Sequence, residues 1–266
     1  MLSTTFPLSV ARRPRAFLRV AGPDACDYLQ RMLSNDVAAL GVGGSCEALL
    51  LTPKARVIAL LVVVRRGEED FLLLTEPELG ETVLRQLTRM KLGARAEVAP
   101  EEHASFVLLG ADRGGIPSSE YGVPAVEVLD AAPGDLPEVS DGALELLRIR
   151  AGTPRHGREI DDRVLPAEAG LVERAVSFTK GCYPGQEPIA RLHHRGHANR
   201  GLRVLELEGT ELPPYDAAID LDGKPVGRVT SVVREGDHVL ALGYVRREVD
   251  DGADVRVEGR PARLVG

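Results

Sequence analysis

The stretch EALLLTPKARVIALLVVVRR, residues 47–66, indicates the architecture of the first part of the chain. Two apolar runs flank a Pro-containing turn at residues 52–55, which is typical of two neighbouring strands. The run DFLLLTE at 70–76 adds a third strand, and continuous apolar runs predict strands buried on both faces. From Glu76 to Lys91, apolar residues recur every three or four positions, which predicts a helix packed on this sheet.

Further helices and strands are expected on either side of this segment. PDACDYLQRMLSND, from Pro23 onward, places its apolar residues on one helical face. ASFVLLG and PAVEVL, at 104–110 and 124–129, predict two more strands. SDGALELLRIRAG predicts a helix capped by Ser140 or Asp141 and stopped at Gly152. The first two hundred residues therefore predict an α+β fold.

The pattern changes beyond Arg200. Short β-rich runs such as LRVLELEG, GRVTSVV and HVLALGYV are separated by Gly- and Asp-rich turns, which predicts a small all-β barrel or sandwich. We therefore expect a boundary here, with one region at 1–200 and a second at 201–266.

Composition narrows the possible functions. The chain has 266 residues and a formal net charge of −7, which argues against a general polyanion binder. Trp is absent and aromatic residues make up only 4%, so a stacking platform for RNA is poorly supported. Met1 to Val20 lacks the apolar run of a signal peptide, and no stretch approaches the roughly 20 apolar residues that span a bilayer. We expect a cytoplasmic protein without a membrane partner.

The stretch KGCYPGQEPIARLHHRGH, residues 180–197, concentrates reactive groups around Cys182. Gly181 and Gly185 permit close approach of a ligand, and a cation at Lys180 would favour the reactive thiolate of Cys182. The three cysteines of the chain form neither a disulfide framework nor a CxxC motif, so reduced thiols are expected. An inert buried thiol is the alternative.

The same stretch is basic within an acidic protein. From Lys180 to Arg203 there are five Lys or Arg residues and one acidic residue, Glu187, so an anionic ligand would fit. A solvated basic linker would also explain the charge, but not the clustered turn formers and hydrogen-bonding groups, and we favour a binding loop. A metal held by His193 and His197 is disfavoured by Gly196 and the adjoining arginines, and no metal site is predicted.

The segment RIRAGTPRHGREIDDRVLPAEAGL, residues 148–171, is the second informative stretch. The carboxylate of Glu168 could accept hydrogen bonds from the amino-pyrimidine edge of a heterocycle. It could equally be a charge at the start of a helix.

Four motifs together, RIRAGTPRHGREID, LPAEAGL, SFTKGCYPGQE and ARLHHRGHANRGL, resemble the YgfZ branch of the folate-binding superfamily that also contains the aminomethyltransferase of the glycine cleavage system. Looser similarity extends over nearly the whole chain. The resemblance implies two interleaved ferredoxin-like-type α+β subdomains and a C-terminal small β-barrel, arranged as a ring around a central channel that binds folate.

The resemblance also implies a set of site residues. The family signature falls on Lys180, Gly181, Cys182, Tyr183, Gly185, Gln186 and Glu187, and the arginine that follows it falls on Arg191. Cys182 and Lys180 are the expected catalytic pair. The others, with Glu168 and Arg148, are expected to bind the ligand.

The implied function is that of an accessory protein for the assembly or repair of iron–sulfur enzymes, including radical enzymes that modify tRNA. Its cofactor would be tetrahydrofolate or a one-carbon derivative, and its partners would be iron–sulfur client or assembly proteins. Direct tRNA binding is not expected.

The alternative is a folate-dependent aminomethyl or methyl transferase, or a demethylase, acting on a small amine. Against it, Ala59 and Leu60 stand where aminomethyltransferases carry an acidic pair, so no carboxylate is available there as acid or base. A Gly-Tyr-Thr-Gly-Glu element of the transferases is also missing. Ala55 replaces the Gly that usually follows Pro-Lys in the branch.

Overall fold

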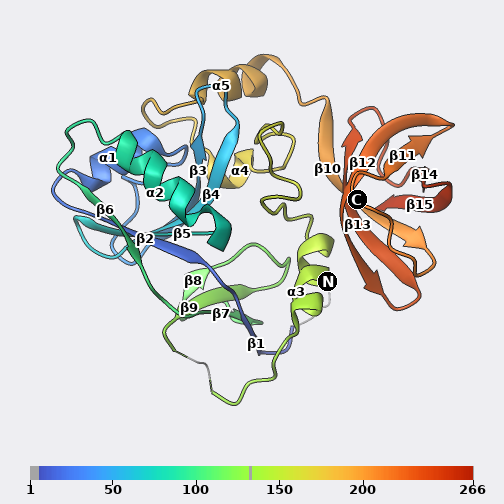
Figure 1. Cartoon of the computed structure of the whole chain (residues 1–266), viewed down its shortest axis with the longest axis horizontal. Coiled ribbons are helices and arrows are strands. Elements are labelled where there is room, and N and C mark those ends of the chain that lie inside the picture. Colours follow the sequence, from blue (N-terminus) through green and yellow to red (C-terminus); the bar gives the residue numbers. More distant parts are fainter. Residues whose placement is uncertain (1–5, 132–133, 266) are drawn as a thin grey trace.

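The computed structural model describes residues 6–131 and 134–265 and contains two mixed α+β bodies and a closed six-stranded barrel (Figure 1). The α+β class and the C-terminal barrel predicted from the sequence are confirmed. Residues 1–5, which belong to the stretch inspected for a signal peptide, lie outside the described residues.

The first body is a five-stranded antiparallel sheet in the order β3-β4-β5-β2-β6. Helices α1 and α2 pack their apolar faces on this sheet and bury its main core (Figure 1). The strands are β2 (Ala16–Ala21), β3 (Ser45–Leu51), β4 (Val57–Arg65), β5 (Asp70–Thr75) and β6 (Glu97–Glu101). The helices are α1 (Ala25–Met32), the 3₁₀ turn η1 (Pro77–Leu79) and α2 (Gly80–Arg89).

The hairpin β3–β4 forms where the sequence predicts it. Its turn is closed by backbone hydrogen bonds from Thr52 N to Arg56 O and from Ala55 N to Thr52 O, both 2.9 Å. Ala55 adopts a φ of 58°, a left-handed conformation that glycine adopts more easily. The prediction of burial on both faces is confirmed for β5, whose last five residues are all buried. Along β4, fully buried residues alternate with half-buried ones that pack against further apolar clusters, so burial is incomplete on one face. The half-buried face borders a cavity.

The chain is interleaved between the two bodies. Strand β1 (Ser9–Arg12) belongs to the second sheet, of order β1-β7-β9-β8, whereas β2 lies in the first sheet. The other strands of the second sheet are β7 (Ser105–Leu109), β8 (Ile116–Pro117) and β9 (Ala125–Leu129). Helix α3 (Asp141–Arg150) follows, and its N-cap is Ser140, whose Oγ accepts a hydrogen bond from Ala143 N.

Buried ion pairs join the two bodies where the chain crosses from β1 to β2. Arg13 lies 2.7 Å from Glu76 and 3.1 Å from Glu120, and Arg15 lies 2.5 Å from Glu120 and 3.0 Å from Glu127. Burial alone would raise the pKa of Glu120, but Arg15 and Arg13 lower it below its ordinary value. The pKa of Glu76 is also below its ordinary value, so Glu76 and Glu120 stay charged and hold both arginines at the seam.

After α3 the chain returns to the first body. Helices α4 (Val172–Ala175) and α5 (Gln186–Arg195) lie beside β3 and β4, and a third apolar cluster joins residues 160–189 to both strands. Tyr244 of the barrel belongs to the same cluster. The segment 151–199 therefore connects the first body to the barrel.

The barrel closes in the order β10-β13-β12-β11-β14-β15. Its strands are β10 (Arg200–Glu208), β11 (Ala218–Leu221), β12 (Lys224–Glu235), β13 (His238–Arg246), β14 (Asp254–Val257) and β15 (Arg260–Val265). In the parts of the chain that the structure describes, no helix has the length and apolar character needed to cross a membrane.

The buried carboxylate of Glu159 lies at the contact between the barrel and α3, beside an apolar cluster of Ile149 with Leu240 and Leu242. Its oxygens lie 3.1 Å from Arg148 Nη1 and 2.7 Å from Ser231 Oγ, and its backbone carbonyl accepts a 2.8 Å hydrogen bond from the Tyr244 hydroxyl. The Glu159 side chain has no exposed surface, so removing its charge takes one buried counter-charge from Arg148 and replaces one acceptor oxygen by a donor.

We expect Glu159→Gln to destabilise the protein by about 3 kcal/mol, because it breaks a buried ion pair by removing one partner. Urea unfolding followed by circular dichroism measures the change. The matched control is Glu235→Gln, which removes a more exposed partner of Arg150 and should cost less than about 1 kcal/mol. Equal effects of the two substitutions would contradict the role assigned to Glu159.

Candidate functional site

The Cys182 loop lies between α4 and α5 and packs against the β3–β4 turn. Cys182 itself is exposed. Gly185, the N-cap of α5, has a φ of 83°, and a Cβ atom there would lie 2.7 Å from Thr52 O and 3.1 Å from Ala55 Cα. Only glycine satisfies both the conformation and the close approach at this position.

The binding loop predicted for residues 180–197 ends at Gly185, because residues 186–195 form α5. Gln186, Glu187 and Pro188 occupy the first turn of this helix, where the missing N–H of proline leaves no helical hydrogen bond unmade. Glu187 is exposed, and its charge is favourable at a helix N-terminus. Pro188 is therefore compatible with the first turn of α5.

Lys180 anchors the loop to α1. Its ammonium donates hydrogen bonds to the carbonyl oxygens of Gln30 (2.5 Å), Leu33 (2.6 Å) and Asn35 (2.8 Å), at and just beyond the C-terminal end of α1. Burial lowers the pKa of Lys180 to about 8. All three donors of the ammonium are occupied, so in this geometry Lys180 positions the loop.

Tyr183 holds the loop from the other side. Its ring is buried in the apolar cluster between α5 and the β3–β4 hairpin, and burial raises the pKa of its hydroxyl to about 12. The ammonium of Lys180 lies 5.3 Å from the ring centroid. Cys182 thus lies exposed between two anchored neighbours.

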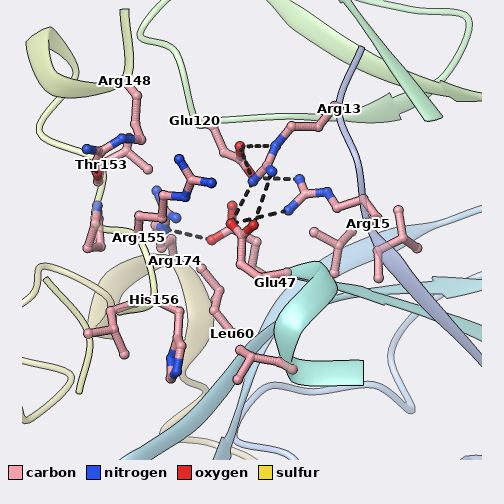
Figure 2. Close-up of a pocket in the computed structure, with 16 residues that line it drawn as sticks. Arg13, Arg15, Glu47, Leu60, Glu120, Arg148, Thr153, Arg155, His156 and Arg174 are labelled. Carbon is pink, nitrogen blue, oxygen red and sulfur yellow. Dashed lines mark hydrogen bonds and ion pairs between the residues drawn. The ribbon is translucent and has the colours of Figure 1, made fainter. Parts of the chain in front are cut away.

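A polar cavity of about 30 Å³ lies at the seam between the two α+β bodies (Figure 2). Charged side chains from both bodies point toward one another across it (Figure 2). It is lined by Arg13, Arg15, Glu47, Leu60, Val62, Leu74, Glu76, Leu79, Glu120, Arg148, Thr153, Pro154, Arg155, His156, Ile160 and Arg174. The cavity has room for little more than a water molecule.

Glu47 and Arg174 form the least satisfied part of this cavity. Arg174 Nε lies 2.6 Å from Glu47 Oε2, but the pair is not aligned as a hydrogen bond. Both of these atoms, together with Arg174 Nη2 and His156 Nδ1, are buried without a hydrogen-bond partner among the described residues. Such groups are expensive to bury, which makes the cavity a candidate ligand site.

The strand position of the missing acidic pair also lies at this cavity. Leu60 lines the cavity, whereas Ala59 points into the core of the first body. The strand therefore brings no carboxylate to the cavity, and the nearest substitute is Glu47 on the neighbouring strand β3.

Arg148 and Glu168 are both engaged in ion pairs. Arg148 contacts Glu145 at 2.5 Å, Glu159 at 3.1 Å and the carbonyl of Thr153 at 2.6 Å, and it forms part of the cavity wall. Glu168 accepts hydrogen bonds from Leu165 N and from the guanidinium of Arg200, both at 3.0 Å for the nearest atoms. Glu168 is therefore placed at the junction with the barrel.

A larger groove, about 1320 Å³, runs beside α5, and we call it the α5 groove. It contains Arg191, and at its wall the ring of His193 stacks on Phe178 with centroids 4.0 Å apart. Because α5 ends at Arg195, His193 and His197 do not share a helical face. No cluster of His, Cys, Asp or Glu suited to a metal ion occurs within 6–131 and 134–265.

The structure therefore places the sequence-predicted residues in three locations. The Cys182 loop directly precedes α5, which carries Gln186, Glu187 and Arg191. Arg148 lies at the seam cavity, and Glu168 lies at the barrel junction. Sequence reasoning missed the residues that crowd the seam cavity, namely Arg13, Arg15, Glu47, Glu120, His156 and Arg174. The sequence signal that could have indicated this site is Glu47, the one charged residue in the otherwise largely apolar strand β3.

The chain is similar in sequence to aminomethyltransferases and to proteins named YgfZ. Residues 16–112 match the GCVT N-terminal domain family. The chain is 26% identical to an aminomethyltransferase of Rubrobacter xylanophilus, over 92% of this chain and 78% of that protein. It is 27% identical to the tRNA-modifying protein YgfZ of Pectobacterium atrosepticum, over 77% of this chain and 72% of that protein.

A solved structure shares the fold. The glycine cleavage system aminomethyltransferase T of Bartonella henselae superposes with a TM-score of 0.85 at 21% identity, covering 97% of this chain and 85% of that one. The fold class predicted from the sequence motifs is confirmed by this match.

We expect Gly185→Ala to destabilise the protein by more than about 1 kcal/mol, since alanine is strained at this φ and its Cβ would meet the β3–β4 turn. Thermal unfolding measures this loss. The variant should also change the rate at which exposed Cys182 reacts with a disulfide reagent at neutral pH. Cys46 reacts slowly at this pH, because burial raises the pKa of its thiol to about 11.

Gly181→Ala is the control within the same loop, because a Cβ there meets no atom within 4 Å. It should shift stability by less than about 0.5 kcal/mol. A similar loss in both variants would show that the contact between Gly185 and the turn does not hold the loop.

Proposed function

We propose that this chain, which is similar to GcvT-type and YgfZ-type proteins of the folate-binding superfamily, binds a reduced folate in the seam cavity. The bound species is tetrahydrofolate or a one-carbon derivative. The protein acts as a cytoplasmic accessory factor of the YgfZ branch, supporting assembly or repair of iron–sulfur enzymes, with Cys182 as its reactive thiol.

The observation that carries folate binding is the set of unpartnered polar atoms facing the seam cavity. The edge of a pterin ring presents paired N–H donors beside carbonyl and ring-nitrogen acceptors. The carboxylate of Glu47 is suited to accept from such donors, and Arg174 and His156 supply groups for the acceptors. A ligand with this edge would satisfy groups that the protein alone leaves unpaired.

Entry of a pterin requires the cavity to open, because about 30 Å³ holds only water-sized groups. The Glu47–Arg174 pair is suited to this movement. The two side chains are 17% and 24% exposed, and separating them breaks a 2.6 Å ion pair, a cost that hydrogen bonds from the ligand to both groups would offset. The Arg13 and Arg15 ion pairs form the more rigid wall.

Cys182 lies outside the residues that line the seam cavity, and its side chain is exposed. This placement supports a thiol that meets a partner protein, as a transient iron or cluster ligand or in thiol exchange. The two sites are joined structurally: Lys180 binds the carbonyl of Asn35, and Asn35 Nδ2 donates to the backbone carbonyl of Glu47 at 2.7 Å.

One observation favours the alternative, a transferase or demethylase acting on a small amine. Glu47 brings a carboxylate into the cavity, and a carboxylate is the group such chemistry needs as acid or base. Leu60, which stands at the cavity where the transferases carry an acidic residue, weighs against it.

We expect isothermal titration calorimetry to show tetrahydrofolate binding to the wild type, with Glu47→Gln weakening it at least about tenfold, because a charged acceptor is lost. Glu81→Gln, an exposed carboxylate that does not line the cavity, is the control and should bind like the wild type. Absence of binding to the wild type would refute the folate proposal.

Cys182→Ser separates the two functions of the proposal. It should bind tetrahydrofolate like the wild type, yet fail to restore iron–sulfur enzyme activity in cells that lack the protein. Restored activity would exclude the thiol role. Formation of a one-carbon folate from tetrahydrofolate and a methylated amine, unaffected in Cys182→Ser and abolished in Glu47→Gln, would instead establish the transferase.

A further inference from the structure

The α5 groove has no role in the folate proposal, although it is far larger than the seam cavity. Three segments form it: the β3–β4 turn at 53–56, residues 165–178, and α5 with the residues that follow it to 198. These segments come from distant parts of the sequence and are held together by the apolar cluster around Ile189 and Tyr183. The groove is therefore built by the fold.

Positive charge is concentrated on the rim of the groove. Lys54, Arg56, Arg191 and Arg195 line it, and within the described ranges no carboxylate lies at ion-pair distance from any of them. Glu173 is the acidic residue of the lining. Arginines just outside the groove are paired, for example Arg163 with Asp161. In a chain of net charge −7, this rim is an available cationic surface.

The floor of the groove is apolar and continuous with the core. Val176 and Ile189 are 8% and 5% exposed, and partly buried Leu165, Val172 and Phe178 pack against the same cluster. An apolar centre with a charged rim is the anatomy of a protein–protein interface. Its dimensions suit an extended or helical segment better than a compact small molecule.

We propose that the α5 groove docks a short acidic segment of a partner protein, with aliphatic or aromatic side chains placed between the acidic residues. The carboxylates of that segment meet Lys54, Arg56, Arg191 and Arg195, and its apolar side chains cover the floor. The docking does not depend on folate binding at the seam.

A protein segment fits the groove better than single-stranded RNA does. RNA binding relies on open aromatic faces for stacking, but the ring of Phe178 is already stacked by His193. The aliphatic floor offers little to bases. Docking along α5 would also bring the partner toward exposed Cys182, which lies just before this helix.

Fluorescence anisotropy with a short labelled peptide of glutamates and leucines tests the proposal on the full-length protein. We expect binding that weakens with added salt, and that is lost when Gln replaces Glu or Ser replaces Leu in the peptide. The double variant Lys54→Glu/Arg195→Glu, which changes both sides of the groove, should weaken binding at least about tenfold.

The matched control is Lys224→Glu/Arg247→Glu, the same charge change on exposed barrel residues, which should bind like the wild type. Both double variants should retain wild-type tetrahydrofolate binding in calorimetry, so that failure of the docking and failure of the folate proposal are distinguishable. Circular dichroism melting verifies that each variant is folded.

Three results would overturn the proposal. The first is equal affinity for the glutamate and glutamine peptides. The second is tight binding of an unstructured RNA oligonucleotide that depends on Lys54 and Arg195 while the peptide fails to bind, which would assign the groove to nucleic acid. The third concerns competition with the labelled peptide. If p-aminobenzoyl-polyglutamate displaces it at lower concentrations than the unlabelled peptide does, the α5 groove would be assigned to a folate tail.

Discussion

Burial of two guanidinium groups at one crossing of the chain is the constraint on which the rest of the structure depends. Arg13 and Arg15 flank Pro14 where the chain leaves the second sheet and enters the first. A buried guanidinium without a counter-charge is too costly for a stable fold. Carboxylates from both bodies, Glu76 on one side and Glu120 and Glu127 on the other, must therefore converge on the crossing.

This convergence explains why a polar cavity lies where two apolar sheets meet. Once Arg13 and Arg15 have taken their partners, Glu47 and Arg174 are left facing the remaining space with incomplete hydrogen bonding. The barrel is attached by the same kind of interaction, with Glu159 between Arg148 and Ser231. Buried charge pairs thus act beside apolar clusters at the junctions of the three parts. The polar groups left without partners define the ligand site that we propose.

The proposed functions divide between two surfaces. The seam cavity is small, enclosed and rich in hydrogen-bonding groups, which suits recognition of a heterocycle. The α5 groove is large and open, with an apolar floor and a cationic rim, which suits a protein segment. Asn35 accepts a hydrogen bond from Lys180, which anchors the Cys182 loop, and donates one to the backbone of Glu47 in β3. The Cys182 loop and the seam cavity are therefore connected through Asn35.

Local patterns predicted several elements because short-range physics controls them. The β3–β4 hairpin follows from apolar runs around a Pro turn, the α3 cap follows from Ser140, and the barrel follows from short strands between Gly turns. Helix α5 was missed because Pro184, Pro188 and nearby glycines are typical of loops. At the third helical position, however, a proline interrupts no hydrogen bond.

By itself, the sequence determined the α+β class, the barrel, and the motif residues from Lys180 to Arg191, whose roles stay predictions. Only the tertiary structure decided which charges are free. It pairs Glu168 with Arg200, encloses Arg148 between Glu145 and Glu159, and caps α1 with Lys180. Spacing along the chain cannot reveal such pairings, because each joins residues brought together by packing, and a charge is available to a ligand only when the fold leaves it unpaired.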